Sequence, residues 1–290
     1  MKARPAVLTL TDTFDTIVLR PELPKVTDPV VCKSWDLGAP EVRTATQGAA
    51  GADGNIDSTT LTGSRTVTFD LQLMGDDPYD ILERLAAMTH PTRRPTLKVW
   101  RVGGSGEVYE MGLRGNPFSV SFTRRSAAII ELQLTFEAPL GYLVSALREV
   151  SSNPAVGEDP HRFKFPATFP ISTGHGSGSY PVVTQPIGGS APVAPTILIY
   201  GPAKNPRIEA DGGRSFAFTG LTLATGQYVE IDMGAGTVRL NGATNASLYH
   251  LVDWAKSTFW TWLPRTTPSV RYVAAAGQIT VRWRERRLTI

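Results

Sequence analysis

A strict alternation of apolar and polar residues over residues 64–75 is the feature that most constrains how this chain can fold. The odd-numbered residues are apolar, namely Val67, Phe69, Leu71 and Leu73. The even-numbered residues between them are polar, namely Thr66, Thr68, Asp70 and Gln72. Successive side chains of a strand point to opposite faces of a sheet. The pattern therefore predicts a strand with one buried face and one solvated face.

A short helix is predicted directly after this strand. Asp77 stands at the N-cap position and Pro78 at the first helical position, where proline is well tolerated. Ile81, Leu82, Leu85 and Met88 then recur at helical spacing. We expect one amphipathic helix over about residues 78–89 that packs on the sheet.

The rest of the chain has the character of a mainly β protein. Hairpins are predicted from residues 97–102 with 107–113 around the glycine-rich turn 103–106, and from 228–232 with 237–240. Further strands are predicted at 128–139 and 278–290. The content of 27 glycines and 22 prolines favours many turns over long helices. Residues 1–140 are expected to form a four- to six-stranded sheet or small barrel with one helix.

Two domains are expected because 290 residues exceed the usual size of one core. We place the first at residues 1–150 and an all-β second domain at 196–290. Residues 151–195 are rich in Pro, Gly and Ser and predict a connector that includes an extended segment.

The charge distribution argues against nucleic-acid recognition. Residues 1–150 carry 16 basic and 18 acidic side chains, a balance of −2, whereas residues 151–290 carry 13 and 8, a balance of +5. The basic excess is interpreted as a solvated strand face. The single cysteine, Cys32, excludes an internal disulfide, and the sequence predicts neither a signal peptide nor membrane insertion.

The motifs of catalysis and cofactor binding are absent or incomplete. Asp53, Asn55 and Asp57 have the spacing of a calcium loop, but Ser58 replaces the glycine that such a loop requires. The four histidines do not form a zinc-ligand pattern, and the glycines at 103–106 match no nucleotide-binding loop. We expect no metal, no cofactor and no enzymatic activity.

An aromatic cluster near the carboxyl end admits two interpretations. It contains Tyr249, Trp254, Phe259, Trp260 and Trp262. Clustered tryptophans usually form a core or an interface, because each buries roughly 150–250 Å². Trp254, Trp260 and Trp262 are the candidates for sugar stacking if the cluster is exposed instead.

Three groups of segments, in this order, resemble the distal tail proteins of siphophages. The first group is residues 35–43, 51–57 and 63–73; the second is 165–172 and 195–209; the third is 228–242, Trp260 with Leu263, and 279–288. The chain departs from the family pattern at residues 263–268, where the family often has a Pro-Gly-x-Asn turn, and at 185–189.

The resemblance implies a ring-forming, split-barrel-like first domain and a galectin-like β-sandwich. It implies a structural hub at the distal end of the virion tail, assembled in the host cytoplasm as a six-membered ring with a channel for DNA. Expected partners are the tail tube protein, the tail-tip hub protein and the tape measure protein. Arg43, Asp53, Asp57 and Arg65 are the residues that we expect to serve the local fold or the subunit interface.

Two other functions are compatible with the residues. The chain could be an adhesion module that binds host-surface carbohydrate, which requires exposed Trp or Tyr in a groove. A wall hydrolase is the enzymatic alternative, which requires a paired set of carboxylates such as Glu230 and Asp232.

Overall fold

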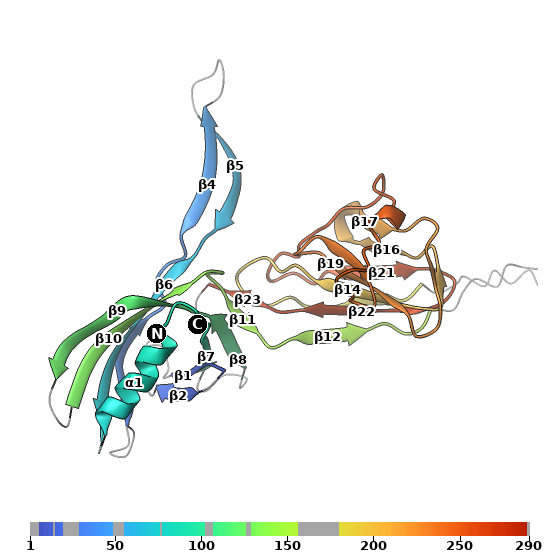
Figure 1. Cartoon of the computed structure of the whole chain (residues 1–290). Coiled ribbons are helices and arrows are strands. Elements are labelled where there is room, and N and C mark those ends of the chain that lie inside the picture. Colours follow the sequence, from blue (N-terminus) through green and yellow to red (C-terminus); the bar gives the residue numbers. More distant parts are fainter. Residues whose placement is uncertain are drawn as a thin grey trace, which may run out of the picture. The chain divides into compact units, whose positions relative to one another are not determined.

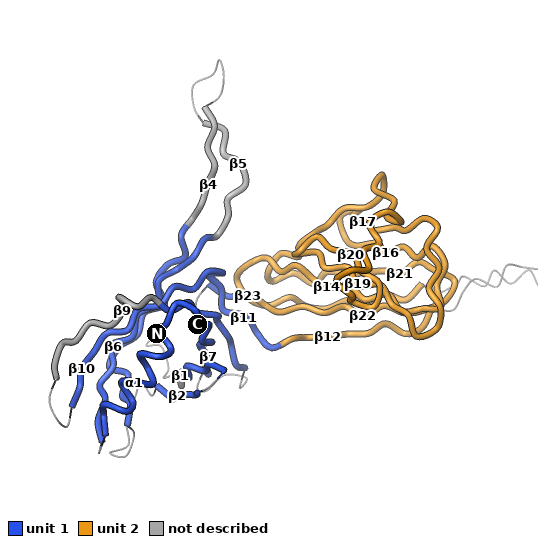
Figure 2. Tube along the Cα trace, viewed as in Figure 1, with its two compact units in different colours: residues 1–146, 286–290 blue, residues 147–285 orange. Residues whose placement is uncertain are grey.

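The computed structural model describes residues 6–13, 15–19, 29–48, 55–75, 77–101, 107–125, 129–155 and 180–288. The chain divides into two units, the first of residues 1–146 with 286–290 and the second of residues 147–285 (Figure 2). Each unit has its own hydrophobic core. The predicted turn at 103–106 and the segment 165–172 lie outside the described residues.

The described residues of the first unit form two large antiparallel sheets and one two-stranded sheet (Figure 1). The six-stranded sheet has the order β2 (Thr16–Leu19), β1 (Ala6–Thr11), β7 (Thr96–Arg101), β8 (Val108–Gly112), β11 (Leu143–Ser145), β23 (Arg286–Arg287). The four-stranded sheet has the order β3 (Val30–Asp36), β6 (Arg65–Met74), β10 (Ile129–Ala138), β9 (Arg114–Arg125). A further pair, β4 (Val42–Gly48) with β5 (Asn55–Thr62), forms a two-stranded sheet of its own.

The core of the first unit is built from the alternating strands that the sequence predicted. Every second residue of β6 and β10 is buried, and the two strands pair in register with Phe69 opposite Leu134. Phe69 and Phe136 meet edge to face with ring centroids 6.1 Å apart. The prediction of a half-buried strand at residues 64–75 is confirmed.

Helix α1 (Pro78–Met88) follows the predicted capping chemistry. The Asp77 carboxylate accepts hydrogen bonds from the backbone N–H groups of Tyr79 and Asp80, which have no partner within the first turn. Ile81, Leu85 and Met88 are buried, so the apolar face packs on the core.

The second unit contains a five-stranded and a four-stranded antiparallel sheet. The first has the order β12 (Arg148–Ser151), β22 (Gln278–Trp283), β14 (Thr196–Tyr200), β19 (Tyr228–Asp232), β20 (Thr237–Leu240). The second has the order β13 (Val182–Thr184), β21 (Ser269–Val273), β16 (Arg207–Ala210), β17 (Arg214–Ala217). Smaller elements are the pair β15 (Ala203–Lys204) and β18 (Thr222–Leu223), and the 3₁₀ turns η1 (Asp211–Gly213) and η2 (Tyr249–Leu251).

Buried residues from both sheets form one core in this unit. Ile197 and Val281 come from the five-stranded sheet, and Ile208 and Phe216 come from the four-stranded sheet. Two sheets that share a core form a sandwich. The expected mainly β fold class is therefore confirmed.

The carboxyl end differs from the single strand that was expected at residues 278–290. Ile279, Val281 and Trp283 are buried in β22 as predicted, but the ladder stops before Arg284. The chain then returns to the first unit, where β23 pairs with β11. The two units meet between residues 146 and 147, and residues 286–290 rejoin the first unit. Alternation does not encode a strand's partner, so the sequence did not indicate this return.

Candidate interaction surfaces

The four-stranded sheet of the first unit has a buried apolar face and an opposite polar face, here called the outer face. Polar side chains of β6 and β10 lie on this outer face, namely Thr66, Thr68, Asp70, Gln72, Glu131, Gln133, Thr135 and Glu137, and each is exposed or half-buried. A sheet with this pattern buries one face and presents the other to water or to a polar partner.

Polar and charged groups on the outer face interact from strand to strand, and Lys33 of β3 reaches across β6 to Glu131 of β10. Lys33 Nζ lies 2.5 Å from Glu131 Oε1. Ser34 Oγ and Gln133 Nε2 both donate to the Asp70 carboxylate, the second over 2.8 Å. These two hydrogen bonds hold the pKa of Asp70 below its usual value, so this carboxylate stays ionised at neutral pH.

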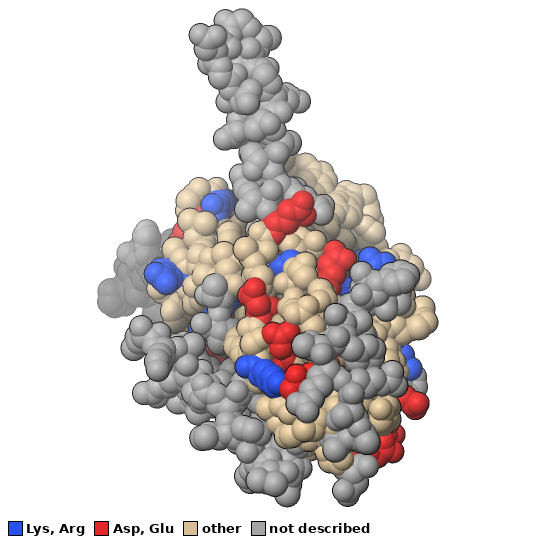
Figure 3. Space-filling model, turned by 90° about the vertical axis from the view of Figure 1, so that its left-hand side faces the viewer, with Lys and Arg blue, Asp and Glu red and all other residues tan. Residues whose placement is uncertain are grey.

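Two arginines of β9 stand opposite glutamates of β10 in this sheet. Arg114 stands opposite Glu137, and Arg124 stands opposite Glu131, where β9 pairs with β10. On the side of the molecule that Figure 3 views, basic and acidic side chains are dispersed among uncharged ones, and the described residues form no broad basic area. The described side chains of the outer face thus form no continuous basic track of the kind that tight binding of a phosphate backbone requires.

The β4–β5 ribbon carries two of the residues that the sequence singled out. Arg43 stands opposite Leu61, and Asp57 stands opposite Thr46, so both belong to the ribbon but are not register partners. Asp53 lies outside the described residues. Among the described strands, β4 and β5 pair only with one another. An isolated two-stranded hairpin is marginally stable in water, which favours a further partner for this ribbon.

Arg65 occupies the interior of the first unit. Its side chain is buried, and Nη1 donates to the Leu288 carbonyl oxygen over 2.9 Å. Burial lowers its pKa from the ordinary arginine value. Of the two roles expected for Arg65, this position favours the one in the fold, because the guanidinium holds the returning carboxyl segment.

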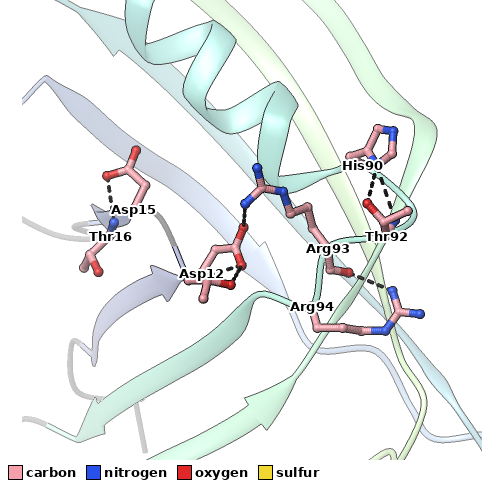
Figure 4. A network of polar contacts seen from close by, with 8 residues as sticks. Asp12, Asp15, Thr16, His90, Thr92, Arg93 and Arg94 are labelled. Atoms are coloured by element: carbon pink, nitrogen blue, oxygen red, sulfur yellow. Dashed lines mark hydrogen bonds and ion pairs between the residues drawn. The ribbon is translucent and has the colours of Figure 1, made fainter.

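Two ion pairs that the sequence reasoning missed connect the β1–β2 turn with α1 and the loop after it. Arg93 Nη1 donates to Asp12 Oδ2 over 2.9 Å (Figure 4), and Arg84 Nε donates to Asp15 Oδ2 over 2.5 Å. These side chains, with Ala87 and Met88, line a cavity of about 420 Å³. Sequence separations of 81 and 69 residues left no local signal for either pair.

The acidic partners of these pairs are stabilised in their ionised forms. Burial opposes ionisation of Asp12, but hydrogen bonds from Thr13 and the Arg93 guanidinium bring its net pKa below the usual value. The hydrogen bond from Arg84 lowers the pKa of Asp15 despite partial burial. The charges neutralise one another and fix the turn against the helix, which is a structural role.

The three tryptophans expected to stack on sugar do not share one exposed surface. Trp260 and Trp262 are each 5% exposed and belong to the core of the second unit. Trp254 is 48% exposed and stacks on Tyr249, with ring centroids 5.5 Å apart. The cluster is therefore mostly core, with one exposed aromatic pair at its edge.

Among the residues that the structure describes, no group of His, Cys, Asp and Glu side chains is placed to hold a metal ion. Within the same residues, every helix is too short or too polar to cross a membrane. Glu230 and Asp232, the carboxylates considered for hydrolysis, lie on β19 opposite Arg239 and Thr237.

Comparisons with known proteins bear on both units. Residues 188–286 match the model of the siphovirus-type tail component, C-terminal domain (SPP1_Dit). The crystal structure of SPP1 Dit (gp 19.1), described as a paradigm of the hub adsorption apparatus in phages that infect Gram-positive bacteria, aligns with a TM-score of 0.59 at 13% identity. The alignment covers 97% of this chain and 99% of that chain.

Two structures of the phage P2 baseplate in its activated conformation also align. The one with Ca has a TM-score of 0.46 and 11% identity, and the one with Sr has 0.45 and 12%; each covers 98% of this chain and 99% of the other. No curated protein sequence matches this chain. Residues 188–286 are thus similar to the siphovirus-type tail component family, and the whole chain has the fold of SPP1 Dit, which confirms the resemblance to distal tail proteins.

Proposed function

We propose that this chain is the distal tail hub of a long-tailed bacteriophage, a non-enzymatic protein that joins the tail tube to the host-adsorption apparatus. The match of residues 188–286 to a tail component family carries this proposal. The fold shared with SPP1 Dit over nearly the whole chain supports it. The protein would be assembled in the host cytoplasm and would occupy the distal end of the virion tail.

The first unit has the features that a ring-forming subunit needs. A ring closed by head-to-tail contacts requires two different complementary surfaces on each subunit. Strands β3 and β9 lie at the two edges of the four-stranded sheet. Because edge strands present unpaired backbone groups, they can pair with a neighbouring subunit. The β4–β5 ribbon offers a third contact that belongs to neither large sheet.

In a six-membered ring, the outer face of the four-stranded sheet would line the channel. Its side chains are polar and its charges are mixed, as the Lys33–Glu131 pair illustrates. Such a wall stays hydrated, and its described side chains give DNA no continuous basic surface to bind. The chain would thus allow DNA to pass without recognising it. The tail tube protein, the tail-tip hub protein and the tape measure protein are the proposed partners.

Shortening the ribbon tests ring formation. In the variant, a two-residue Asn-Gly turn replaces residues 45–59 and directly connects Thr44 with Thr60, which are register partners. We expect the wild type to form closed rings in negative-stain images with a hexameric mass by light scattering, and the variant to be monomeric. Its thermal midpoint should match that of the wild type, because the ribbon pairs with neither large sheet.

Two controls complete this experiment. Lys204→Glu changes an exposed charge on β15 of the second unit and should leave the rings intact. Both proteins are also mixed with the purified tail tube protein, which supplies a template if the ring closes only beside its partner. A wild type that stays monomeric in both conditions, or that is absent from purified virions, contradicts the proposal. Clearing of a peptidoglycan gel would contradict the non-enzymatic role.

A further inference from the structure

We propose that Glu285 fastens to the second unit both strands by which the chain passes between its two units, and that this contact restricts the motion of one unit relative to the other. The chain enters the second unit between residues 146 and 147 and returns to the first between residues 285 and 286. The contact of Glu285 with Arg148 and Gly188, all three in the second unit, is here called the Glu285 clamp. It is a conformational device that does not depend on the proposed hub role.

Strand register shows that the two passages belong to neighbouring antiparallel strands. In the first unit Val144 stands opposite Arg286, and in the second unit Arg148 stands opposite Trp283. Three residues, 145–147, separate the two ladders on one strand, whereas two residues separate them on the other. A difference of one residue is that of a β-bulge, which interrupts the ladder and bends the strand. The passage between the units is therefore a paired crossing with an interruption in its pairing.

Glu285 occupies a position that the alternation of β22 predicts to be apolar. It follows Val281 and Trp283 at two-residue spacing, and all three residues are buried, with Glu285 only 3% exposed. Burial of a carboxylate costs free energy unless charged or hydrogen-bonding partners compensate for the lost water. A glutamate at this position therefore needs specific partners inside the second unit.

Two segments of the second unit supply these partners. Arg148 Nη1, at the start of β12, lies 3.3 Å from Glu285 Oε1. The backbone N–H of Gly188 donates to the same oxygen over 3.0 Å. The segment that carries Gly188 is itself held in place, because the backbone N–H of Ile187 donates to the Thr266 carbonyl over 2.8 Å. The carboxylate thus joins both passing strands to a third segment of the second unit.

The close fit around the carboxylate explains the glycine at position 188. A Cβ atom on Gly188 would lie 2.5 Å from Glu285 Oε2 and 2.8 Å from the carboxyl carbon. Gly188 does not have a positive φ, so the backbone conformation does not itself require glycine. The missing side chain instead leaves the space that the buried carboxylate fills.

Beyond the crossing, the returning strand is fastened within the first unit. The Arg287 guanidinium lies 4.5 Å from the centroid of the Tyr109 ring, within the range of a cation–π interaction. Arg65 Nη1 donates to the Leu288 carbonyl oxygen over 2.9 Å. Hinges are short segments that absorb the change in backbone angles when domains move. With the returning strand held in both units, such a change is confined to the short crossing on which the Glu285 clamp acts.

Distance measurements between the units test this restriction in the full-length protein. Spin labels are attached at Ala86→Cys on α1 and Lys204→Cys on β15, which are exposed positions, whereas the native Cys32 is buried and stays unlabelled. Labelled protein is diluted with an excess of unlabelled protein, so that the distances measured by pulsed electron–electron double resonance lie within one copy. We expect a single narrow distance distribution when the Glu285 clamp is intact.

Two variants open the clamp in different ways. Glu285→Gln keeps the size of the side chain and an acceptor for Gly188, but it removes the charge that attracts Arg148. Gly188→Ala keeps that charge and displaces the carboxylate. Both variants should lose the narrow distribution. Hydrogen exchange of the paired strands 148–151 and 280–283 should become roughly 10- to 100-fold faster, as expected for one lost hydrogen bond to a charged group.

Glu149→Gln is the matched control, because Glu149 pairs with Arg282 across the same two strands but its side chain is 44% exposed. Exposed ion pairs contribute little, so this variant should keep the narrow distribution and the wild-type exchange rates. Thermal unfolding verifies that all variants are folded. The inference is overturned if the wild type is as broadly distributed as Glu285→Gln, if either clamp variant keeps the wild-type distribution, or if Glu149→Gln loses it. Ring formation is scored separately in negative-stain images, so failure here leaves the proposed hub role untouched.

Discussion

Replacing Gly115 with alanine tests how the end of α1 packs on the four-stranded sheet. Gly115 is buried near the start of β9 and pairs with Phe136 of β10. A Cβ atom at this position would lie 2.2 Å from the carbonyl oxygen of Thr89 and 2.4 Å from its carbonyl carbon. Thr89 is the C-cap of α1. Because both close atoms belong to backbone, a rotamer change cannot relieve the contact.

The size of the effect follows from this geometry. Overpacking a core typically costs about 1–3 kcal/mol, and a contact with backbone belongs at the upper end, about 3 kcal/mol. For a unit of roughly 150 residues, each kcal/mol lowers the thermal midpoint by about 2–4 °C. We therefore expect Gly115→Ala to lower the midpoint of the first unit by about 6–12 °C.

Differential scanning calorimetry of the full chain measures this midpoint. The matched control is Gly112→Ala on β8, where an added Cβ would meet no atom within 4 Å. Neither glycine has a positive φ, so backbone strain does not distinguish the two variants. If both variants unfold at the same temperature, the close approach of β9 to the end of α1 is refuted.

Three further outcomes are expected for the first unit. Phe136→Ala should destabilise it by about 3–5 kcal/mol in urea unfolding, because it removes a buried ring that packs against Phe69. Asp77→Ala should cost about 1 kcal/mol in the same assay, because two helix N–H groups lose their acceptor; an unchanged midpoint would refute the cap. The pKa of Asp15 is lower in the folded protein than in the unfolded chain, where an Asp carboxyl has a pKa of about 3.9. Its contribution to the free energy of unfolding is therefore complete above a pH of about 3.9, and it is lost as the pH falls through the folded-state pKa. The urea midpoint of the wild type should therefore fall more between pH 6 and pH 3 than that of Asp15→Asn, and equal slopes would contradict the Arg84–Asp15 pair.

Local patterns predicted the elements whose signals lie within a few residues. The alternation of Val67, Phe69 and Leu71 identified a strand and its buried face, and Asp77 with Pro78 identified the start of α1. Neither prediction depended on a distant partner. The resemblance of ordered segments to distal tail proteins added the two-part β architecture.

Surface residues were less predictable than the elements that carry them. Trp260 and Trp262 lie within eight residues of Trp254 in the sequence, yet they are buried and Trp254 is exposed. The pairing of Asp12 with Arg93 joins residues that are 81 positions apart. Side-chain burial and long-range ion pairs depend on which segments pack together, and composition alone does not specify this.

The sequence by itself determined where strands and the helix form and which of their faces are apolar. Hydrophobic periodicity and helix capping depend only on residues that lie close together in the chain. Only the tertiary structure decided which strands become neighbours. It returned β23 to the first unit beside β11 and buried Arg65 against Leu288. The physical reason is that each strand takes the partner that buries the most apolar surface over the whole fold. This total depends on segments far apart in the sequence, so no local pattern of residues predicts it.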